Sequence, residues 1–176
     1  MINLKKKKGM EEKVEKKIVP PRLTRDLLEV EKELPKSVPQ ALLKKGKESV
    51  MSFEVQYTPD SSTYWYGGKY IFAFEVLEDY PVSAPLVMCK TKIYHPNIDY
   101  NGNVCLNILK EAWTPSFTIL NLITGVYQLF IVPNPMDPLN HDVAKLMRDD
   151  LNQFKANVKK TLRGGYYFGQ DFPRFT

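Results

Sequence analysis

A chain of 176 residues with 43% hydrophobic residues has the size of one ordinary domain and can bury a substantial core. No stretch approaches the roughly 20 apolar residues of a membrane span, and the first residues lack the apolar core of a secretory signal, so we expect no membrane association. Two cysteines are too few for a disulfide framework, which indicates a reducing compartment, cytoplasmic or nuclear.

Positive charge is concentrated at the N-terminus. Residues 1–17 contain seven lysines and three glutamates, whereas the rest of the chain is close to neutral. We therefore expect residues 1–19 to form a flexible basic arm and residues 20–176 to form one folded domain. The arm can dock on an acidic protein surface, bind nucleic acid or simply aid solubility. Nucleic acid is disfavoured, because the rest of the chain has no basic face with interleaved aromatic residues.

A first helix is predicted directly after the arm. The Pro20-Pro21 pair suits a first helical turn, where a missing N–H has no cost. Apolar residues then recur at helical spacing, at Leu23, Leu27, Val30 and Leu34. We expect this helix to end at Pro35, because proline cannot continue the hydrogen-bond pattern.

Strand-like alternation follows the helix. Residues 52–57 and 69–76 alternate apolar with polar side chains, and Gly67-Gly68 between them is the predicted hairpin turn. Val87, Cys89 and Thr91 form a third alternating set, and residues 38–43 weakly indicate another strand. Successive strands with short connections predict an antiparallel meander.

The second half of the chain begins with a long irregular stretch, residues 92–117. Its many apolar residues favour a packed loop, and long loops of this kind are often functional. Helices are predicted over residues 119–130, after Thr118 as N-cap, and over residues 143–162, with a kink near Asp149-Asp150 and an end at Gly164-Gly165. One sheet with helices in separate runs predicts an α+β fold.

Cys105 lies in the irregular stretch and is the residue best suited to chemistry. A cysteine thiol has an ordinary pKa of about 8.5, so only a small fraction is thiolate at neutral pH, but that fraction is strongly nucleophilic. The alternative is a buried apolar side chain, which is our interpretation of Cys89 because it alternates in a strand. The Asn97 amide can donate to a developing oxyanion or bond its own turn. The Asp137 carboxylate can accept a hydrogen bond from an incoming lysine amine or cap the following helix.

Other chemistries are disfavoured by the same residues. A Cys–His hydrolase needs an oriented imidazole, and nothing in the sequence orients His95 or His141 toward Cys105. A zinc site made from both histidines and both cysteines lacks paired ligand spacing. The chain has no glycine-rich phosphate loop. We therefore expect no metal, no cofactor and no bound nucleotide.

The order and spacing of short motifs resemble the ubiquitin-conjugating enzyme family over about residues 20–163. The motifs are Tyr80-Pro81, Tyr94-His95-Pro96-Asn97-Ile98, Gly102-Asn103-Val104-Cys105-Leu106-Asn107-Ile108-Leu109, Trp113, Pro133-Asn134-Pro135 and Asp137-Pro138-Leu139. The resemblance implies a four-stranded antiparallel sheet with an N-terminal helix and C-terminal helices. It also implies that Cys105 accepts the C-terminal glycine of a ubiquitin-like modifier as a thioester from an activating enzyme, which consumes the ATP. A substrate lysine then attacks to form an isopeptide bond.

The resemblance also implies roles for the neighbouring residues. Asn97 would support the oxyanion or the active-site loop, Asp137 would orient the lysine, and His95 would be structural. The residues that would face a RING-type ligase are Tyr80, Pro81, Trp113 and Pro115.

Three features resemble the neddylation (Nedd/Rub) branch of the family. They are the run Cys105-Leu-Asn-Ile-Leu-Lys-Glu-Ala-Trp113, the run Leu162-Arg163-Gly164-Gly165-Tyr166 and the lysine-rich arm that begins Met1-Ile2-Asn3-Leu4. By this resemblance Met1, Ile2 and Leu4 would dock on the activating enzyme or a co-ligase, and cullins would be the substrates. We expect a monomer. A carrier of ubiquitin itself and a non-catalytic scaffold that binds modifiers or ligases are the alternatives.

Overall fold

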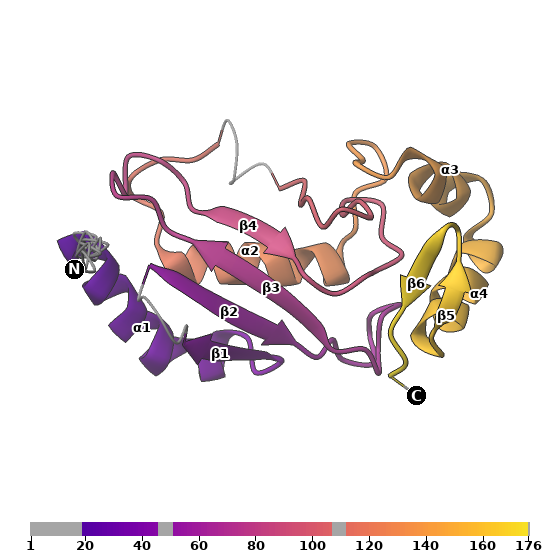
Figure 1. Ribbon diagram of the computed structural model, residues 1–176, viewed down its shortest axis with the longest axis horizontal. Helices are drawn as coiled ribbons and strands as arrows, with labels where there is room; N and C mark the ends of the chain where they lie inside the picture. Colours follow the sequence, from indigo (N-terminus) through magenta and orange to yellow (C-terminus); the bar gives the residue numbers. More distant parts are fainter. Residues whose placement is uncertain (1–18, 46–50, 107–111, 176) are drawn as a thin grey trace, which may run out of the picture.

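Helix α1 (Pro21–Ser37) is the first element of the computed structural model, which describes residues 19–45, 51–106 and 112–175 (Figure 1). Pro21 is the first helical residue, as predicted, and the apolar face of the helix is buried. The prediction that Pro35 ends the helix is wrong, because the helix continues to Ser37. Proline removes only its own N–H bond, and the last turn closes where the N–H of Val38 donates to Leu34 O at 2.8 Å.

The sheet has four antiparallel strands in the order β1-β2-β3-β4, which confirms the predicted meander. The strands are β1 (Ala41–Lys45), β2 (Ser52–Tyr57), β3 (Tyr70–Glu75) and β4 (Leu86–Cys89). The register places Val55 of β2 between Leu43 of β1 and Phe72 of β3. Phe53 and Phe74 stack with ring centroids 5.1 Å apart, so adjacent strands are joined by side-chain packing as well as by backbone hydrogen bonds.

Three details of the strand prediction need correction. The first strand begins at Ala41 rather than at residue 38, and β4 ends at Cys89, so Thr91 lies outside it. Gly67-Gly68 does not form a tight hairpin turn, because the connection from β2 to β3 runs over residues 58–69. Asp60 orders this longer loop by accepting hydrogen bonds from the Ser62 N–H at 2.9 Å and the Tyr127 hydroxyl at 3.0 Å.

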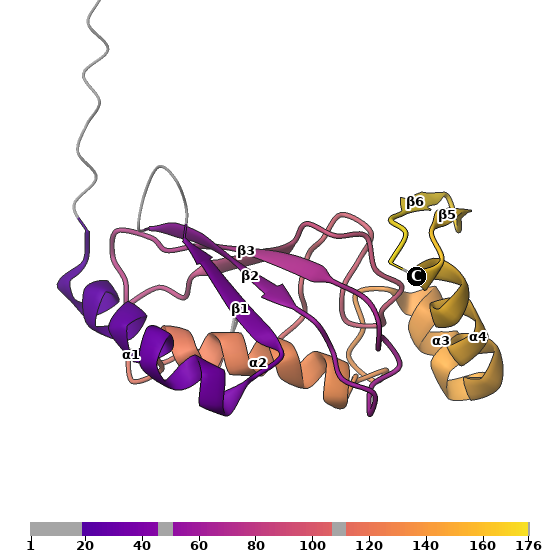
Figure 2. The ribbon, with the colours of Figure 1, turned by 90° about the horizontal axis from the view of Figure 1, so that it is seen from below.

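Helix α2 (Ile119–Ile131) lies across one face of the sheet, on the same side as α1 (Figure 2). Thr118 caps it as predicted: its hydroxyl accepts from the Asn121 N–H at 3.4 Å, and the Asn121 side chain accepts from the Thr118 N–H at 2.9 Å. The Tyr57 hydroxyl donates to Ile123 O at 2.9 Å and joins the sheet to the helix inside the core. The main core therefore lies between the sheet and α2.

The last predicted helical run is two helices, α3 (His141–Asp149) and α4 (Leu151–Leu162), at the end of the molecule away from α1 (Figure 1). The break falls where a kink was predicted. Asp150 is responsible, because its N–H donates to Leu146 O while its side chain accepts from the Gln153 N–H at 2.9 Å and starts α4. Within the described residues no helix is long and apolar enough to cross a membrane.

A small hairpin that the sequence analysis did not predict follows α4. Its strands are β5 (Gly165–Tyr167) and β6 (Gln170–Phe172). Gly164 ends α4 with a φ of +75°, as the glycine pair predicts, and a Cβ there would lie 2.8 Å from the Cα of Arg174. The rings of Phe168 and Phe172 pack against Tyr94 and Tyr100, so the hairpin covers the loop after β4.

Candidate active site

The loop after β4 is held in place by His95. The backbone N–H of Asn97 donates to His95 Nδ1 at 2.9 Å, so the other ring nitrogen, Nε2, carries the proton and donates to Leu129 O at 3.0 Å. The ring stacks on Trp65 with centroids 4.2 Å apart. Burial lowers the pKa of His95 to about 3. The ring is therefore neutral, and both nitrogens are occupied, so His95 has no lone pair to offer as a base for Cys105.

Cys105 lies at the end of this loop and is largely buried, with 5% of the residue exposed. Its N–H donates to Asn97 O at 2.8 Å, which fixes its backbone against the segment that His95 holds. Its Sγ lies 3.5 Å from Oδ2 of Asp137, with the thiol as donor. Because the Asp137 side chain is exposed, the sulfur lies at the border between core and surface. Both cysteines are thiols.

Cys89 differs from Cys105 in its surroundings. It belongs to the main apolar core, and its thiol donates to Thr91 O at 3.1 Å. Burial raises the pKa of Cys89 to about 12, which leaves a negligible thiolate fraction at neutral pH. The interpretation of Cys89 as a buried apolar side chain agrees with this environment.

The Asn97 carboxamide is committed to the loop that carries Asp137. The residue is 1% exposed, and its Nδ2 donates to Asn134 O at 2.7 Å and to Asp137 O at 3.0 Å. Its Oδ1 accepts from the Asn134 N–H at 2.8 Å. The N–H groups of Leu139 and Asn140 each donate to Pro96 O at 3.0 Å. Five hydrogen bonds thus join residues 96–97 to residues 134–140.

The structure excludes one of the two interpretations of Asp137, that of a helix cap. The side chain that caps α3 is Asn140, whose oxygen accepts from the Val143 N–H at 3.3 Å. Asp137 therefore does not cap this helix, and its carboxylate is directed to the thiol. The geometry brings together a thiol, an exposed carboxylate and a backbone that is held in place by hydrogen bonds.

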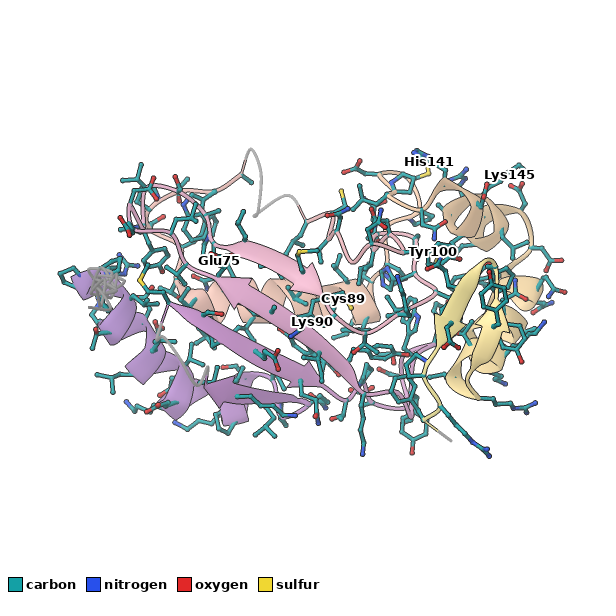
Figure 3. All side chains as sticks on the ribbon, viewed as in Figure 1. Glu75, Cys89, Lys90, Tyr100, His141 and Lys145 are labelled. Carbon is teal, nitrogen blue, oxygen red and sulfur yellow. The ribbon has the colours of Figure 1, made fainter. Side chains whose placement is uncertain are left out.

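His141 begins α3 as an exposed residue, well apart from Cys89 at the end of β4 (Figure 3). In the described ranges no group of three or more histidine, cysteine or acidic side chains could hold a metal ion. The zinc set weighed from the sequence is therefore not brought together.

The four residues predicted to face a ligase belong to the loop after β3 and the loop before α2, and both loops lie at the end of the molecule where α1 begins (Figure 1). The indole N–H of Trp113 donates to Pro81 O at 2.9 Å, and its ring lies 6.1 Å from that of Tyr80. Pro115 is exposed, whereas Tyr80 is buried, so Tyr80 supports this surface from beneath. Met1, Ile2 and Leu4, which were predicted to dock on the activating enzyme or co-ligase, lie outside the described residues.

Sequence reasoning missed two kinds of participant. Backbone groups such as Pro96 O and the Asn134 N–H hold the site together, and backbone roles leave no trace in residue type. It also missed Asp26, which accepts a hydrogen bond from the Tyr80 hydroxyl, and Arg22, which donates to Pro115 O in the loop before α2. A signal was present, because Asp26 occupies a position on the apolar face of α1.

Comparisons with known proteins identify the family to which the chain belongs. Residues 22–162 match the model of the family described as "Ubiquitin-conjugating enzyme". A protein named "NEDD8-conjugating enzyme Ubc12" from Arabidopsis thaliana is 50% identical over 129 residues, which cover 73% of this chain and 70% of that protein. The protein of that name from Schizosaccharomyces pombe is 36% identical over 171 residues, 96% of this chain and 94% of its own length.

A solved structure, described as "S. cerevisiae Ubc12", superposes with a TM-score of 0.77 at 37% identity and covers 88% of this chain and 84% of its own. Because the family model spans most of the chain and the fold superposes on this relative, the chain belongs to the ubiquitin-conjugating enzyme family.

Proposed function

We propose that this chain accepts a NEDD8-type modifier on Cys105 as a thioester and passes it to a lysine of a substrate protein. One observation carries the proposal: the Cys105 sulfur lies 3.5 Å from the exposed carboxylate of Asp137, in a loop whose backbone is fixed by hydrogen bonds. A nucleophile and a carboxylate so arranged can serve acyl capture and then acyl transfer.

Loading is an exchange of thioesters. The Cys105 thiolate attacks the carbonyl carbon of the modifier's C-terminal glycine, which is bound as a thioester to an activating enzyme. The new C–S bond forms as the activating enzyme's thiolate leaves. This step consumes no ATP on this chain, because we assign the ATP-dependent activation to the activating enzyme.

Transfer reverses the role of Cys105 from nucleophile to leaving group. The neutral amine of a substrate lysine attacks the same carbonyl carbon, the C–N bond forms, and the Cys105 thiolate leaves. The amine loses a proton, which passes through solvent to the departing thiolate and restores the thiol. The carboxylate 3.5 Å from the sulfur can accept a hydrogen bond from the amine as it approaches. We therefore assign Asp137 to orienting the lysine.

For Asn97, we favour support of the active-site loop over direct contact with the oxyanion. Both N–H groups of its amide and its oxygen already bond to residues 134–137. A donor aimed at an oxyanion would have to give up one of these bonds. The same bonds hold Asp137 near the sulfur, so loop support alone accounts for their arrangement.

The choice of modifier rests on the relatives. The proteins from Arabidopsis thaliana and Schizosaccharomyces pombe are named NEDD8-conjugating enzymes, and the run from Cys105 to Trp113 resembles the same branch. We extend this to the partners: an activating enzyme, a RING-type ligase with a co-ligase, and cullin-type substrates. We assign the activity to the cytoplasm, the nucleus or both, which fractionation of tagged cells would test.

A charging assay tests the proposal. The chain is incubated with ATP and either the NEDD8 or the ubiquitin activating enzyme with its modifier, and the products are separated without reductant. We expect a reductant-sensitive adduct with NEDD8, a stable oxyester for Cys105→Ser, and an unchanged thioester for Cys89→Ser. Loading by the ubiquitin pathway alone would mean that the modifier is ubiquitin. A thioester that never discharges to free lysine would favour a scaffold.

A further inference from the structure

A carboxylate outside the active-site loops is buried. Asp26 is 1% exposed and lies on the apolar face of α1. Both of its oxygens are bonded: Oδ1 accepts from Arg22 Nε at 2.7 Å, and Oδ2 accepts from the hydroxyl of Tyr80. A charge is costly to bury unless it is well bonded, and a purely apolar side chain would fill this position on the helix face at lower cost. The bonds to Arg22 and Tyr80 are therefore the feature to explain.

Arg22 extends the same link to a second loop. Its Nη1 donates to Pro115 O at 3.3 Å and its Nη2 donates to Phe117 O at 3.4 Å. The planar guanidinium thus bonds at once to the carboxylate of Asp26 and to two carbonyls of the segment before α2. Lysine could not reproduce this geometry with its single ammonium group.

The two loops also contact each other. The Trp113 indole N–H donates to Pro81 O at 2.9 Å, and the centroid of the Trp113 ring lies 6.1 Å from that of Tyr80 and 6.0 Å from that of Phe117. Helix α1, the loop after β3 and the loop before α2 are therefore joined pairwise, so that each of the three contacts the other two. Burial raises the pKa of Tyr80, so its hydroxyl keeps its proton and remains a donor to Asp26 at neutral pH.

We propose that Asp26 is a positioning residue for the ligase surface: through Tyr80 and Arg22 it holds the loops that carry Pro81 and Pro115 in one fixed relation. This inference rests on the proposed function, which gives these loops a ligase to bind. A surface that is already ordered binds its partner without the entropic cost of ordering two separate loops. Asp26 itself need not touch the ligase.

Asp26→Asn tests the inference in the full chain, because it keeps the size of the side chain and removes its charge. Asp60→Asn is the matched control, since Asp60 also accepts a hydrogen bond from a tyrosine hydroxyl, that of Tyr127 at 3.0 Å, but in the loop between β2 and β3. The preformed thioester of each variant is discharged to lysine with increasing amounts of a RING-domain ligase bound to its cullin. Hydrogen exchange of residues 76–85 and 112–117 is measured in parallel.

For Asp26→Asn we expect the ligase concentration at half-maximal rate to rise about tenfold, the size expected from losing a charge-assisted hydrogen bond. The rate at saturating ligase and the ligase-free discharge should match those of the unmodified chain. Exchange should become faster in both segments. Asp60→Asn should change none of these values. Arg22→Lys keeps the charge beside Asp26 but cannot reach both carbonyls, so the ligase concentration at half-maximal rate should rise less, about threefold. This variant replaces Asp26→Asn if Asp26→Asn fails to fold.

An unchanged half-maximal concentration for Asp26→Asn would overturn the inference, and so would an equal rise for Asp60→Asn, because either result would remove the specific link to the ligase surface. A failure of the proposed function looks different: the unmodified chain would form no thioester at all. Even in that case, hydrogen exchange tests whether Asp26 holds the two loops, because it does not depend on thioester formation. Faster exchange in both segments for Asp26→Asn alone supports that role, and unchanged exchange overturns it.

Discussion

The Sγ of Cys105 lies 3.5 Å from Oδ2 of Asp137, although the two residues are 32 positions apart in the sequence. The contact depends on the hydrogen bonds between residues 96–97 and residues 134–140, which bring the two loops together. The first two predictions examine the carboxylate and the amide that holds it.

Asp137→Asn should slow the discharge of a preformed thioester to free lysine by about tenfold to a hundredfold at pH 7, because the amine loses its charged acceptor. Loading should be affected much less, since it involves no amine. Single-turnover discharge measured from pH 7 to pH 9.5 checks this: both chains should discharge faster as more lysine is deprotonated in solution, while the ratio of their rates stays the same. Asp142→Asn, which removes the same charge from an exposed position on α3, should discharge normally. A deficit that disappeared at high pH would contradict the orienting role, because it would mean that Asp137 acts by deprotonating the lysine.

Asn97→Ala should destabilise the fold by about 2–4 kcal/mol, because the Asn134 N–H and two carbonyls lose a buried partner. Discharge should slow as well, since Asp137 is no longer held. Denaturant unfolding and thioester discharge measure the two effects. If discharge slowed while the unfolding free energy stayed the same, the side chain would instead be acting directly on the oxyanion.

His95 should make stability depend on pH. Its folded pKa of about 3 lies below the unfolded value of about 6.5, so between these values the unfolded chain binds more protons. Stability is therefore fully present above about pH 6.5 and falls as the pH drops, by up to about 1.4 kcal/mol per pH unit from this group. Denaturant unfolding between pH 4.5 and pH 7 should show a shallower slope for His95→Gln. His141→Gln, at the exposed histidine, should keep the slope of the unmodified chain.

Gly102→Ala should destabilise the loop that precedes Cys105. Gly102 has a φ of +92°, and a Cβ there would lie 2.2 Å from Cys89 O. The added Cβ would therefore cause a backbone strain of about 1 kcal/mol. It would also clash with the backbone of β4. Gly169→Ala is the control, because Gly169 has a φ of +73° with no atom within 4 Å of the added carbon. Thermal unfolding should show a clearly larger loss for Gly102→Ala, and equal losses would mean that the clash relaxes without cost.

The elements with strong local signals could be predicted from the sequence. The apolar stripe of α2 and its Thr118 cap depend on neighbours within four positions, and both are confirmed. The end of α1 was misjudged, because the effect of Pro35 depends on whether later N–H groups still find acceptors. The hairpin of β5 and β6 was missed, since strands of three residues have too little alternation to recognise.

Sequence reasoning proposed residues for the candidate site, but not their geometry. Motif resemblance selected Cys105, Asn97 and Asp137, but it left two roles open for Asn97. Local reasoning also allowed Asp137 to be a helix cap. Those ambiguities concern which atoms meet across distant segments, and only the folded arrangement of residues 96–97 and 134–140 addresses them. Asp26 was missed because its partner Tyr80 lies 54 residues away.

The C-terminal hairpin has a consequence for how fragments of this protein are designed. The family match ends at residue 162, yet Phe172 is 4% exposed and Phe175 packs on Tyr70 of β3, with ring centroids 5.4 Å apart. A recombinant fragment truncated at the homology boundary would expose several aromatic rings to solvent, and the fragment would be prone to aggregation. An affinity tag is better joined through a spacer beyond Phe175 than fused directly to it.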